Sequence, residues 1–239
     1  MRNENRNNND LRKIEIISDF NLYAEGSCLI KCGNTHVICT ASVENKVPQW
    51  LKDDDRGWIT AEYSLLPRAT LTRVSRETKG VGGRTHEIQR LIGRSLRGVV
   101  DLTVLKGYSI VVDCDVIQAD GGTRTASITG GFVALYIALE KMVKEGKISH
   151  NPIKEFVAAI SVGICNGVPY LDLDYSEDST ADVDANFVLT ENGNIIEIQG
   201  TAEGAPFTED DYSKLLQYAK DGVCNLIKLQ KEAIKNAKI

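Results

Sequence analysis

The sequence predicts an α/β protein in which strands cluster around two central helices and a C-terminal helix, within a single domain spanning residues 1–239. Two patterns support this prediction: short segments with alternating apolar residues indicate strands, and longer segments with apolar residues three and four apart indicate helices. The third observation is composition, because 42% hydrophobic and 26% charged residues are typical of a globular chain. A chain of 239 residues is also long enough to bury a full core as one domain.

The first half of the chain supplies most of the predicted strands. Alternating apolar residues predict four of them, over residues 13–18, 27–32, 36–43 and 58–65. The Gly-Asn-Thr sequence at 33–35 predicts a hairpin turn. Residues 66–83 carry a proline and three glycines among arginines, which is typical of a long exposed loop. Residues 86–100 then predict a helix that buries one side and turns its arginines to another.

The middle of the chain contains a strand, a glycine turn and a helix in direct succession. The predicted strand covers residues 108–118, the turn 119–125 and the helix 126–146. Glycines let backbone N–H groups approach a ligand closely, and the N-terminus of a helix attracts anions, so this turn favours phosphate binding. The spacing matches neither a Walker loop nor a dinucleotide-binding turn. The alternative is a tight turn capped by Thr123 or Thr125.

The last third of the chain predicts further strands, an acidic cluster and a long helix. The strands cover residues 156–165, 169–175 and 195–204, with Asn-Gly at 166–167 as a hairpin turn. Four carboxylates gather at a junction between strands: Glu177, Asp178, Asp182 and Asp184. Either a solvated acidic loop or a magnesium site accounts for such a cluster. The C-terminal helix begins with a capping box, Thr208 to Asp211, and ends in lysines.

Composition and residue spacing narrow the function classes. We find no signal-peptide pattern and no run approaching the roughly 18 apolar residues of a membrane helix, so we expect a cytoplasmic protein without a membrane partner. The six cysteines form no C-x-x-C pair and lie mostly in apolar runs, which predicts buried free thiols. The three histidines are far apart, which argues against a histidine zinc site.

The charge of the chain is unevenly distributed. The formal net charge is −5, yet residues 68–97 carry eight basic and two acidic residues. A basic segment on an acidic body can attract a polyanion such as RNA to one place. The alternative is a solvated or subunit-facing arginine surface.

Several long motifs, in one register from about residue 10 to about 235, resemble the ribonuclease PH family. They are "YAEGSCLIKCGNTHVICTASVE", "GWITAEYSLLPRAT", "GGRTHEIQRLIGRSLRGVVDL", "DCDVIQADGGTRTASITGG", "VAAISVGICNGVPYLDLDYSEDS" and "IIEIQGTAEGAPF". Two departures stand out. The family usually has a glycine where Asn5 stands, and the loop between Arg76 and Arg84 is about two residues short.

The resemblance implies a fold, a reaction and partners. The fold is a single domain of the ribosomal protein S5 domain 2-like type, with mixed sheets packed on helices. The reaction is phosphorolytic 3′-to-5′ exoribonuclease activity, in which inorganic phosphate is the co-substrate and nucleoside diphosphates are released; the reverse reaction adds nucleotides. The implied substrates are tRNA precursors extended beyond the CCA end and rRNA 3′ ends. The implied assembly is a homohexamer, a trimer of dimers.

The resemblance also implies roles for individual residues. Inorganic phosphate is expected at Arg84, Gly122, Thr123 and Arg124. Asp178 and Asp184 are expected to be catalytic, either holding Mg²⁺ or assisting proton transfer. RNA contacts or a subunit interface are expected at Arg68, Arg73 and Arg76.

Other interpretations of these residues remain open from the sequence alone. Arg84 would then be a surface residue and Arg124 would pair with Asp120. Asp172 and Asp174 alternate along a predicted strand and are expected to be solvent-facing or structural.

Two other functions compete with this prediction. One is a catalytically silent RNA-binding ring subunit of an exosome-like assembly. The other is an unrelated small-molecule phosphotransferase. The presence of Arg84, Arg124, Asp178 and Asp184 disfavours the silent subunit, and a phosphotransferase would need a phosphate-binding lysine motif that the sequence lacks.

Overall fold

A five-stranded mixed sheet forms the first half of the molecule in the computed structural model, which describes residues 2–238. Its strands lie in the order β1 (Ile14–Ser18), β2 (Gly26–Cys32), β3 (Thr35–Glu44), β5 (Ser109–Gln118) and β4 (Trp58–Leu65). Neighbouring strands are antiparallel except β4 and β5, which run parallel. A parallel pair needs a crossover, and helix α1 (Gly83–Arg97) supplies it.

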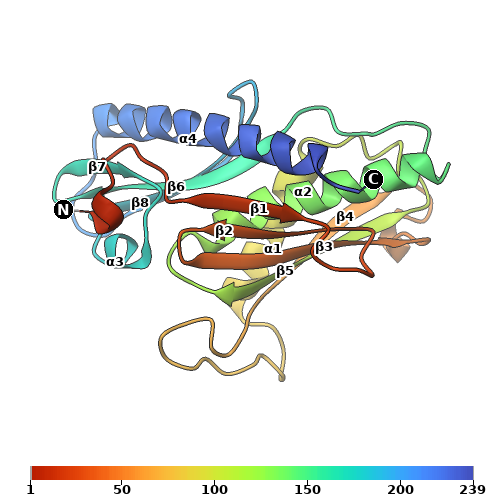
Figure 1. Cartoon of the computed structure of the whole chain (residues 1–239), viewed down its shortest axis with the longest axis horizontal. Coiled ribbons are helices and arrows are strands. Elements are labelled where there is room, and N and C mark those ends of the chain that lie inside the picture. The colour runs from red at the N-terminus through yellow and green to blue at the C-terminus, as the bar shows by residue number, and fades with distance from the viewer. Residues whose placement is uncertain (1, 239) are drawn as a thin grey trace.

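A four-stranded antiparallel sheet forms the second half. Its strands lie in the order β7 (Val168–Leu171), β6 (Val157–Cys165), β8 (Val183–Thr190) and β9 (Ile195–Ala202). The one-turn helix α3 (Tyr175–Asp178) lies between β7 and β8 in the chain. Because α3 follows β7 and precedes β8, it lies beside the end of β7 and the start of β8 (Figure 1).

Two long helices join the sheets. Helix α2 (Thr123–Lys144) packs against β2, β3 and β5 of the first sheet and against β6 of the second. By length and composition α2 is apolar enough to cross a membrane, but 78% of its most apolar window is buried, as expected of a core helix. Helix α4 (Glu209–Lys235) covers β6 and β7 and reaches β1 (Figure 1).

Close packing of α2 against the first sheet depends on a glycine, Gly130. A Cβ atom at Gly130 would lie 2.7 Å from Cγ2 of Ile30 and 2.9 Å from the sulfur of Cys39. These distances are too short for any larger side chain, so the glycine lets α2 approach β2 and β3 closely. The approach fixes where α2 begins, at the glycine turn that follows β5.

The predicted α/β class, with mixed sheets packed on helices, is confirmed, and the predicted strands are found within a few residues of their expected bounds. Helices α1 and α2 each begin three residues earlier than predicted. The prediction of one domain over residues 1–239 stays a prediction.

The predicted strand at 169–175 is wrong in its second half. Strand β7 ends at Leu171, and Asp172 turns the chain with φ of +55°. Asp174 then caps α3, accepting hydrogen bonds from the backbone N–H groups of Ser176 and Glu177, while Glu177 accepts from the N–H of Asp174. This reciprocal capping box outweighs the alternation of apolar residues, because it satisfies backbone donors that the strand edge would leave free.

The two remaining differences concern single residues. Asn5 has φ of +55°, in the left-handed region that glycine favours and that asparagine tolerates better than most residues. Asn5 can therefore adopt this turn although it is not a glycine. All six cysteines are free, but only five are buried: Cys224, on α4, is exposed, so the prediction of a buried thiol is wrong there.

Candidate functional site

The N-termini of α1 and α2 share an unusual arrangement. Each helix begins after a glycine, Gly82 or Gly122, without a side-chain cap and without an acidic residue in its first turn. The first N–H groups of a helix have no partner inside the helix, so here they remain available to a ligand. Each helix also carries an arginine as its second residue, Arg84 on α1 and Arg124 on α2.

Contacts between the two helices bring these starts together. Nη1 of Arg124 lies 3.4 Å from Oε1 of Glu87, in the second turn of α1. The same Nη1 donates to the side-chain oxygen of Gln199 on β9 at 2.9 Å, and Gln199 donates to Glu87 at 2.9 Å. Arg124 is therefore oriented by α1 and β9. The alternative pairing with Asp120 is wrong, because Glu87 is the carboxylate that Arg124 contacts.

Tyr63 is a site residue that the sequence did not reveal. It is buried on β4, and its hydroxyl lies 2.8 Å from the hydroxyl of Thr123, the first residue of α2. Burial raises the pKa of Tyr63, opposed by the hydrogen bond to Thr123 and by the charges of Arg84 and Arg124. The sequence feature that could have identified Tyr63 is its inward position on a strand. A buried phenol hydroxyl needs a polar partner, which indicates a polar group nearby.

The glycine turn before α2 packs directly on the segment that leads into α3. A Cβ atom at Gly121 would lie 2.7 Å from the carbonyl oxygen of Leu173 and 2.8 Å from the nitrogen of Tyr175. Gly122, with φ of +64°, is the N-cap of α2, so neither Thr123 nor Thr125 caps the helix. This close contact sets the phosphate turn against the carboxylate segment.

Asp178 and Asp184 lie next to this turn. Asp178 is the exposed last residue of α3, and Asp184 is half-buried on β8, opposite Gly163 and Thr201. Although Asp178 is exposed, neighbouring protein atoms exclude part of the water around its carboxyl group. This desolvation and the charge of Asp184 raise the pKa of Asp178, while the charges of Arg124, Arg84 and Arg12 lower it. The two carboxylates thus lie within electrostatic range of each other and of both predicted phosphate-binding arginines.

The other acidic residues of this segment are structural. Asp172 pairs with Arg12, and Asp174 and Glu177 both lie within ion-pair distance of Arg6. All three carboxylates are buried, so the solvent-facing interpretation of Asp172 and Asp174 is wrong and the structural one is confirmed. Within the acidic cluster, Glu177 therefore pairs with arginine, and Asp182 is exposed and accepts a hydrogen bond from the backbone N–H of Gly167 at 3.3 Å. Asp178 and Asp184 form the remaining pair.

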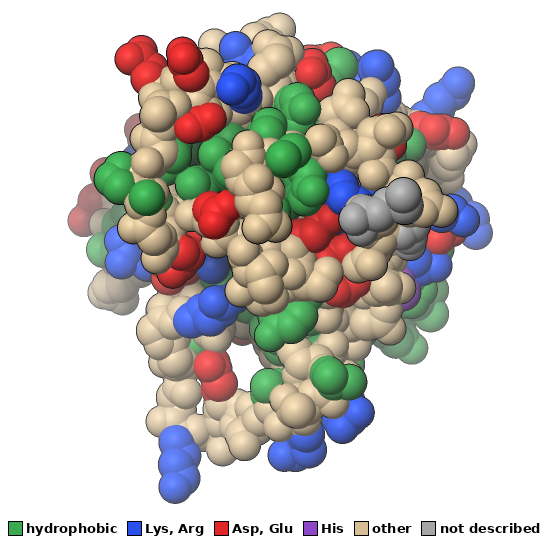
Figure 2. All heavy atoms as spheres, turned by 90° about the vertical axis from the view of Figure 1, so that its left-hand side faces the viewer, with side chains coloured by type: hydrophobic (Ala, Val, Ile, Leu, Met, Phe, Trp, Pro, Cys, Tyr) green, Lys and Arg blue, Asp and Glu red, His purple; other side chains and the backbone are tan. Residues whose placement is uncertain are grey.

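Arg68, Arg73 and Arg76 lie away from this site, on the loop between β4 and α1. All three are exposed. The loop projects from the body of the molecule (Figure 1), and Figure 2 shows basic side chains along its outer edge. The loop is anchored at its base, where the backbone N–H of Ala119 donates to the carbonyl of Ala69 at 2.8 Å, and at Glu77, which accepts from the hydroxyl of Thr85 on α1 at 3.0 Å. The structure thus gathers six predicted residues at one site and leaves these three on a separate surface.

Comparison with known sequences identifies relatives over almost the whole chain. Residues 10–139 match the 3′ exoribonuclease family, domain 1, and residues 155–222 match domain 2 of the same family. Ribonuclease PH of Neisseria meningitidis (serogroup C, strain FAM18) is 57% identical over 229 residues, which cover 95% of each chain. Ribonuclease PH of Neisseria gonorrhoeae (strain NCCP11945) is 58% identical over 226 residues, covering 94% of this chain and 93% of the relative.

Solved structures share the fold at much lower sequence identity. The crystal structure of rice (Oryza sativa) Rrp46 superposes with a TM-score of 0.79 at 19% identity, covering 98% of this chain and 100% of that one. The Archaeoglobus fulgidus exosome with RNA bound to the active site gives 0.78 at 23% identity, covering 95% and 91%. Together with the sequence matches, these findings show that the chain belongs to the ribonuclease PH family of phosphorolytic 3′-to-5′ exoribonucleases.

Proposed function

We propose that the attacking inorganic phosphate lies between the N-termini of α1 and α2, held by Arg84, Thr123, Arg124 and the backbone of Gly122. The observation that carries this proposal is the pair of uncapped helix starts, each with an arginine as its second residue. Uncapped N–H groups favour a bound anion, and arginine donates two parallel hydrogen bonds to phosphate. Tyr63 and Gln199 hold the hydroxyl of Thr123 and the guanidinium of Arg124 in place.

The reaction needs two anions side by side. An oxygen of the bound phosphate attacks the phosphorus of the last phosphodiester of RNA, and the bond from that phosphorus to the 3′ oxygen of the preceding nucleotide breaks. The products are a nucleoside diphosphate and an RNA one nucleotide shorter, whose 3′ oxygen takes a proton. Because the reacting phosphates repel each other, the protein contributes mainly cations and fixed N–H donors that hold them in line.

Asp178 and Asp184 serve the scissile phosphate and the leaving oxygen. Two neighbouring carboxylates without an arginine partner fit Mg²⁺, which typically binds one or two carboxylates together with water and substrate phosphate. No group of three or more His, Cys, Asp or Glu side chains suited to a metal occurs within residues 2–238, so a substrate phosphate would complete the site. Bound there, Mg²⁺ would neutralise charge that develops on the scissile phosphate. The alternative role for Asp178 is proton transfer to the leaving oxygen, which its raised pKa in the absence of a cation favours.

The substrates in this proposal are tRNA precursors extended beyond the CCA end and the 3′ ends of rRNA. A structured RNA can present its single-stranded end to the site while its body reaches the exposed arginines Arg68, Arg73 and Arg76. A homohexamer, built as a trimer of dimers, would bring such loops from several subunits around one RNA. The five buried free thiols support a cytoplasmic location, where thiols stay reduced.

A phosphate-labelling experiment tests this function. The protein is incubated with a 3′-extended tRNA precursor, Mg²⁺ and labelled inorganic phosphate, and the products are separated. We expect labelled nucleoside diphosphates that appear only when phosphate is present, and trimming that ends near the CCA sequence. Release of unlabelled nucleoside monophosphates would show that water is the nucleophile and would contradict the proposal.

A further inference from the structure

The first residues of the chain form a strap that the reaction described above does not use. We define the N-terminal strap as residues 2–12. It contains three arginines, Arg2, Arg6 and Arg12, and the side chains of all three are at least 95% buried. A buried guanidinium needs an anionic partner, because an unpaired buried charge is strongly unfavourable. The carboxylates that pair with these three arginines lie in α3 and in the segment before it.

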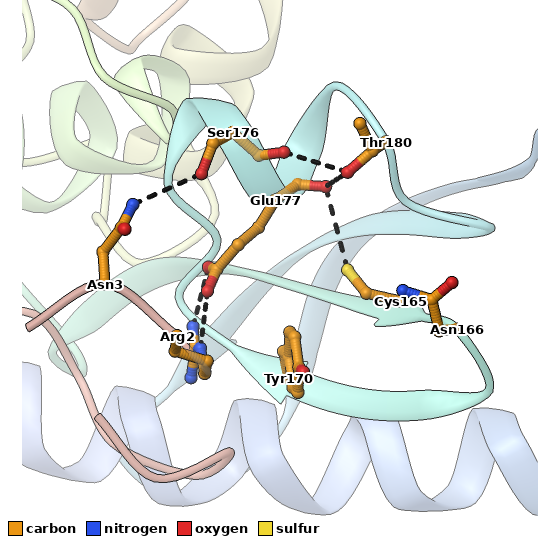
Figure 3. Close-up of a pocket in the computed structure, with 8 residues that line it drawn as sticks. All are labelled: Arg2, Asn3, Cys165, Asn166, Tyr170, Ser176, Glu177 and Thr180. Atoms are coloured by element: carbon orange, nitrogen blue, oxygen red, sulfur yellow. Dashed lines mark hydrogen bonds and ion pairs between the residues drawn. The ribbon is translucent and has the colours of Figure 1, made fainter. Parts of the chain in front are cut away.

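Arg2 lies below α3 and donates to Glu177 of that helix (Figure 3). Its Nε and Nη2 donate to the two carboxylate oxygens of Glu177 at 2.7 and 2.9 Å, in a parallel fork. Nη2 also donates to the carbonyl of Leu171 at 2.7 Å, and Nη1 to the carbonyl of Asn7 at 2.9 Å. Its guanidinium carbon lies 4.6 Å from the centre of the Tyr170 ring. Arg2 thereby ties the strap, the end of β7 and α3 to one another.

Two further strap residues secure the same helix. Nη2 of Arg6 lies 3.3 Å from Glu177 and 3.4 Å from Asp174. The side-chain amide of Asn3 donates to Asp174 at 2.9 Å. Both residues that close the capping box of α3 are therefore held by the strap.

Arg12 connects this arrangement to the phosphate turn. Its Nε and Nη2 pair with both carboxylate oxygens of Asp172 at 3.1 and 2.7 Å, and its Nη1 donates to the backbone carbonyl of Asp120 at 2.5 Å. A Cβ atom at Gly122 would lie only 3.0 Å from Nη2 of Arg12. One side chain thus spans the segment before α3 and the turn before α2.

Helix α3 needs such external support because it has only four residues. A single helical turn fixes many dihedral angles for one or two hydrogen bonds and is unstable by itself. Asp178 is the last residue of that turn, immediately after Glu177. Any movement of Glu177 therefore moves Asp178 relative to the start of α2.

We propose that Arg2 and Arg6 are positioning residues that set the place of Asp178 opposite the phosphate turn, with Arg12 holding the turn and the carboxylate segment in register. The inference rests on the role proposed for Asp178. Among the described side chains of the strap, no hydrogen bond or ion pair reaches a residue proposed to bind the attacking phosphate, and Arg12 approaches only Gly122. Loss of the strap should therefore slow the chemical step more than it weakens phosphate binding. Misplacement of a reacting group by about 1 Å can cost a hundredfold in rate.

The experiment compares Arg2→Ala with the parent chain at a temperature where circular dichroism shows both to be folded. We expect kcat on a short single-stranded RNA to fall roughly tenfold to a hundredfold, with the phosphate KM changed less than twofold. Amide hydrogen exchange should accelerate in residues 175–180 and stay unchanged in α2. Arg2→Lys, which keeps the charge but loses the fork, should give an intermediate kcat.

Chemical rescue gives a readout that a loss of stability would not produce. Arg2 and Glu177 line a small pocket open to solvent, so truncating Arg2 leaves room for a free guanidinium ion. We expect millimolar guanidinium to restore part of the kcat of Arg2→Ala and to leave the parent unchanged. Absence of any rescue, together with unchanged hydrogen exchange in α3, would overturn the proposal.

Two control variants separate positioning from general destabilisation. Met142→Ala truncates a buried side chain near the far end of α2 and should lower the unfolding midpoint without lowering kcat. Arg56→Ala removes an exposed arginine that pairs only with Asp54 and should change neither quantity. If Met142→Ala lowers kcat as much as Arg2→Ala does, the effect reports stability and the proposal is wrong.

The remaining outcomes distinguish this inference from the proposed function. If Arg2→Ala does not accumulate in folded form, Arg6→Ala takes its place with the same expectations, because the ion pairs of Arg6 are longer than that of Arg2. A fully active Asp178→Ala would remove the role of Asp178 itself. If Asp178→Ala is inactive and Arg2→Ala is fully active, the positioning role proposed for the strap is wrong and the role of Asp178 stands.

Discussion

The N-termini of α1 and α2 contrast with those of α3 and α4. Helices α3 and α4 begin with complete capping boxes, Asp174 with Glu177 and Thr208 with Asp211, and carry acidic residues in their first turns. Helices α1 and α2 instead follow a glycine N-cap, and they have neither a capping box nor an acidic residue in the first turn. A capped N-terminus satisfies its own N–H groups, whereas an uncapped one is stabilised when an anion binds. The contrast supports the proposal that α1 and α2, rather than α3 and α4, offer their N-termini to the substrate phosphate.

The largest loss of activity is expected when a carboxylate that has no structural partner is removed. Asp178→Ala and Asp184→Ala should each abolish phosphorolysis and the reverse addition from nucleoside diphosphates, because one transition state serves both directions. Folding should be little affected, since the two carboxylates repel each other. Activity assays in both directions, beside a thermal unfolding curve, check this. Parental activity in either variant would exclude that residue from the site.

Removing one arginine from an uncapped helix start should have the next largest effect. Arg124→Ala should lower phosphorolysis by roughly 10²- to 10³-fold at fixed phosphate, because a charged donor in a preorganised site is lost. RNA binding should persist, since the RNA has other contacts. Steady-state rates over a range of phosphate concentrations, with an RNA gel shift, measure both. Unchanged phosphate dependence would contradict the assignment of Arg124.

The contrast between helix starts can also be altered directly. Gly82→Asp would give α1 the acidic cap that α3 has, and its carboxylate would compete with phosphate for the same N–H groups. We expect the phosphate KM to rise roughly tenfold, equivalent to about 1.4 kcal/mol, without loss of thermal stability. Gly82→Ala is the matched control, because both side chains displace the flexible Glu77 carboxylate, 2.8 Å from the added Cβ. Equal KM values in the two variants would show that this N-terminus does not bind phosphate.

The smallest effect on phosphate binding is expected when arginines outside the helix N-termini are replaced. Replacing Arg68, Arg73 and Arg76 together by alanine should leave the phosphate KM on a short oligonucleotide unchanged. Trimming of tRNA precursors should weaken, with a shallower salt dependence, and the proposed ring should break into dimers. Light-scattering mass beside the two activities checks these expectations. A complete ring that trims precursors normally would show that the three arginines serve neither assembly nor RNA docking.

Local signals explain what the sequence could predict. The glycine turns and the arginines Arg84 and Arg124 were recognisable because their chemistry lies within a few consecutive residues. The long strands were recognisable because alternation repeats along them. The capping box of α3 was also local, as Asp174 and Glu177 have its spacing, but the alternation of apolar residues before it favoured a strand.

Distant partners explain what the sequence could not predict. The fork between Arg2 and Glu177 joins residues 175 positions apart, and the contact between Arg124 and Gln199 joins residues 75 apart. No spacing rule connects such residues, because only the tertiary packing of the chain brings them together. Tyr63 was equally hidden, since its place in a strand gave no sign that Thr123 lay opposite.

Calorimetric titration with inorganic phosphate, in the absence of RNA, tests most directly whether the starts of α1 and α2 hold the nucleophile. The parent chain should bind one phosphate per subunit, Arg124→Ala should bind it at least roughly tenfold more weakly, and Arg56→Ala should match the parent. Equal phosphate affinity in the parent and Arg124→Ala would contradict the account.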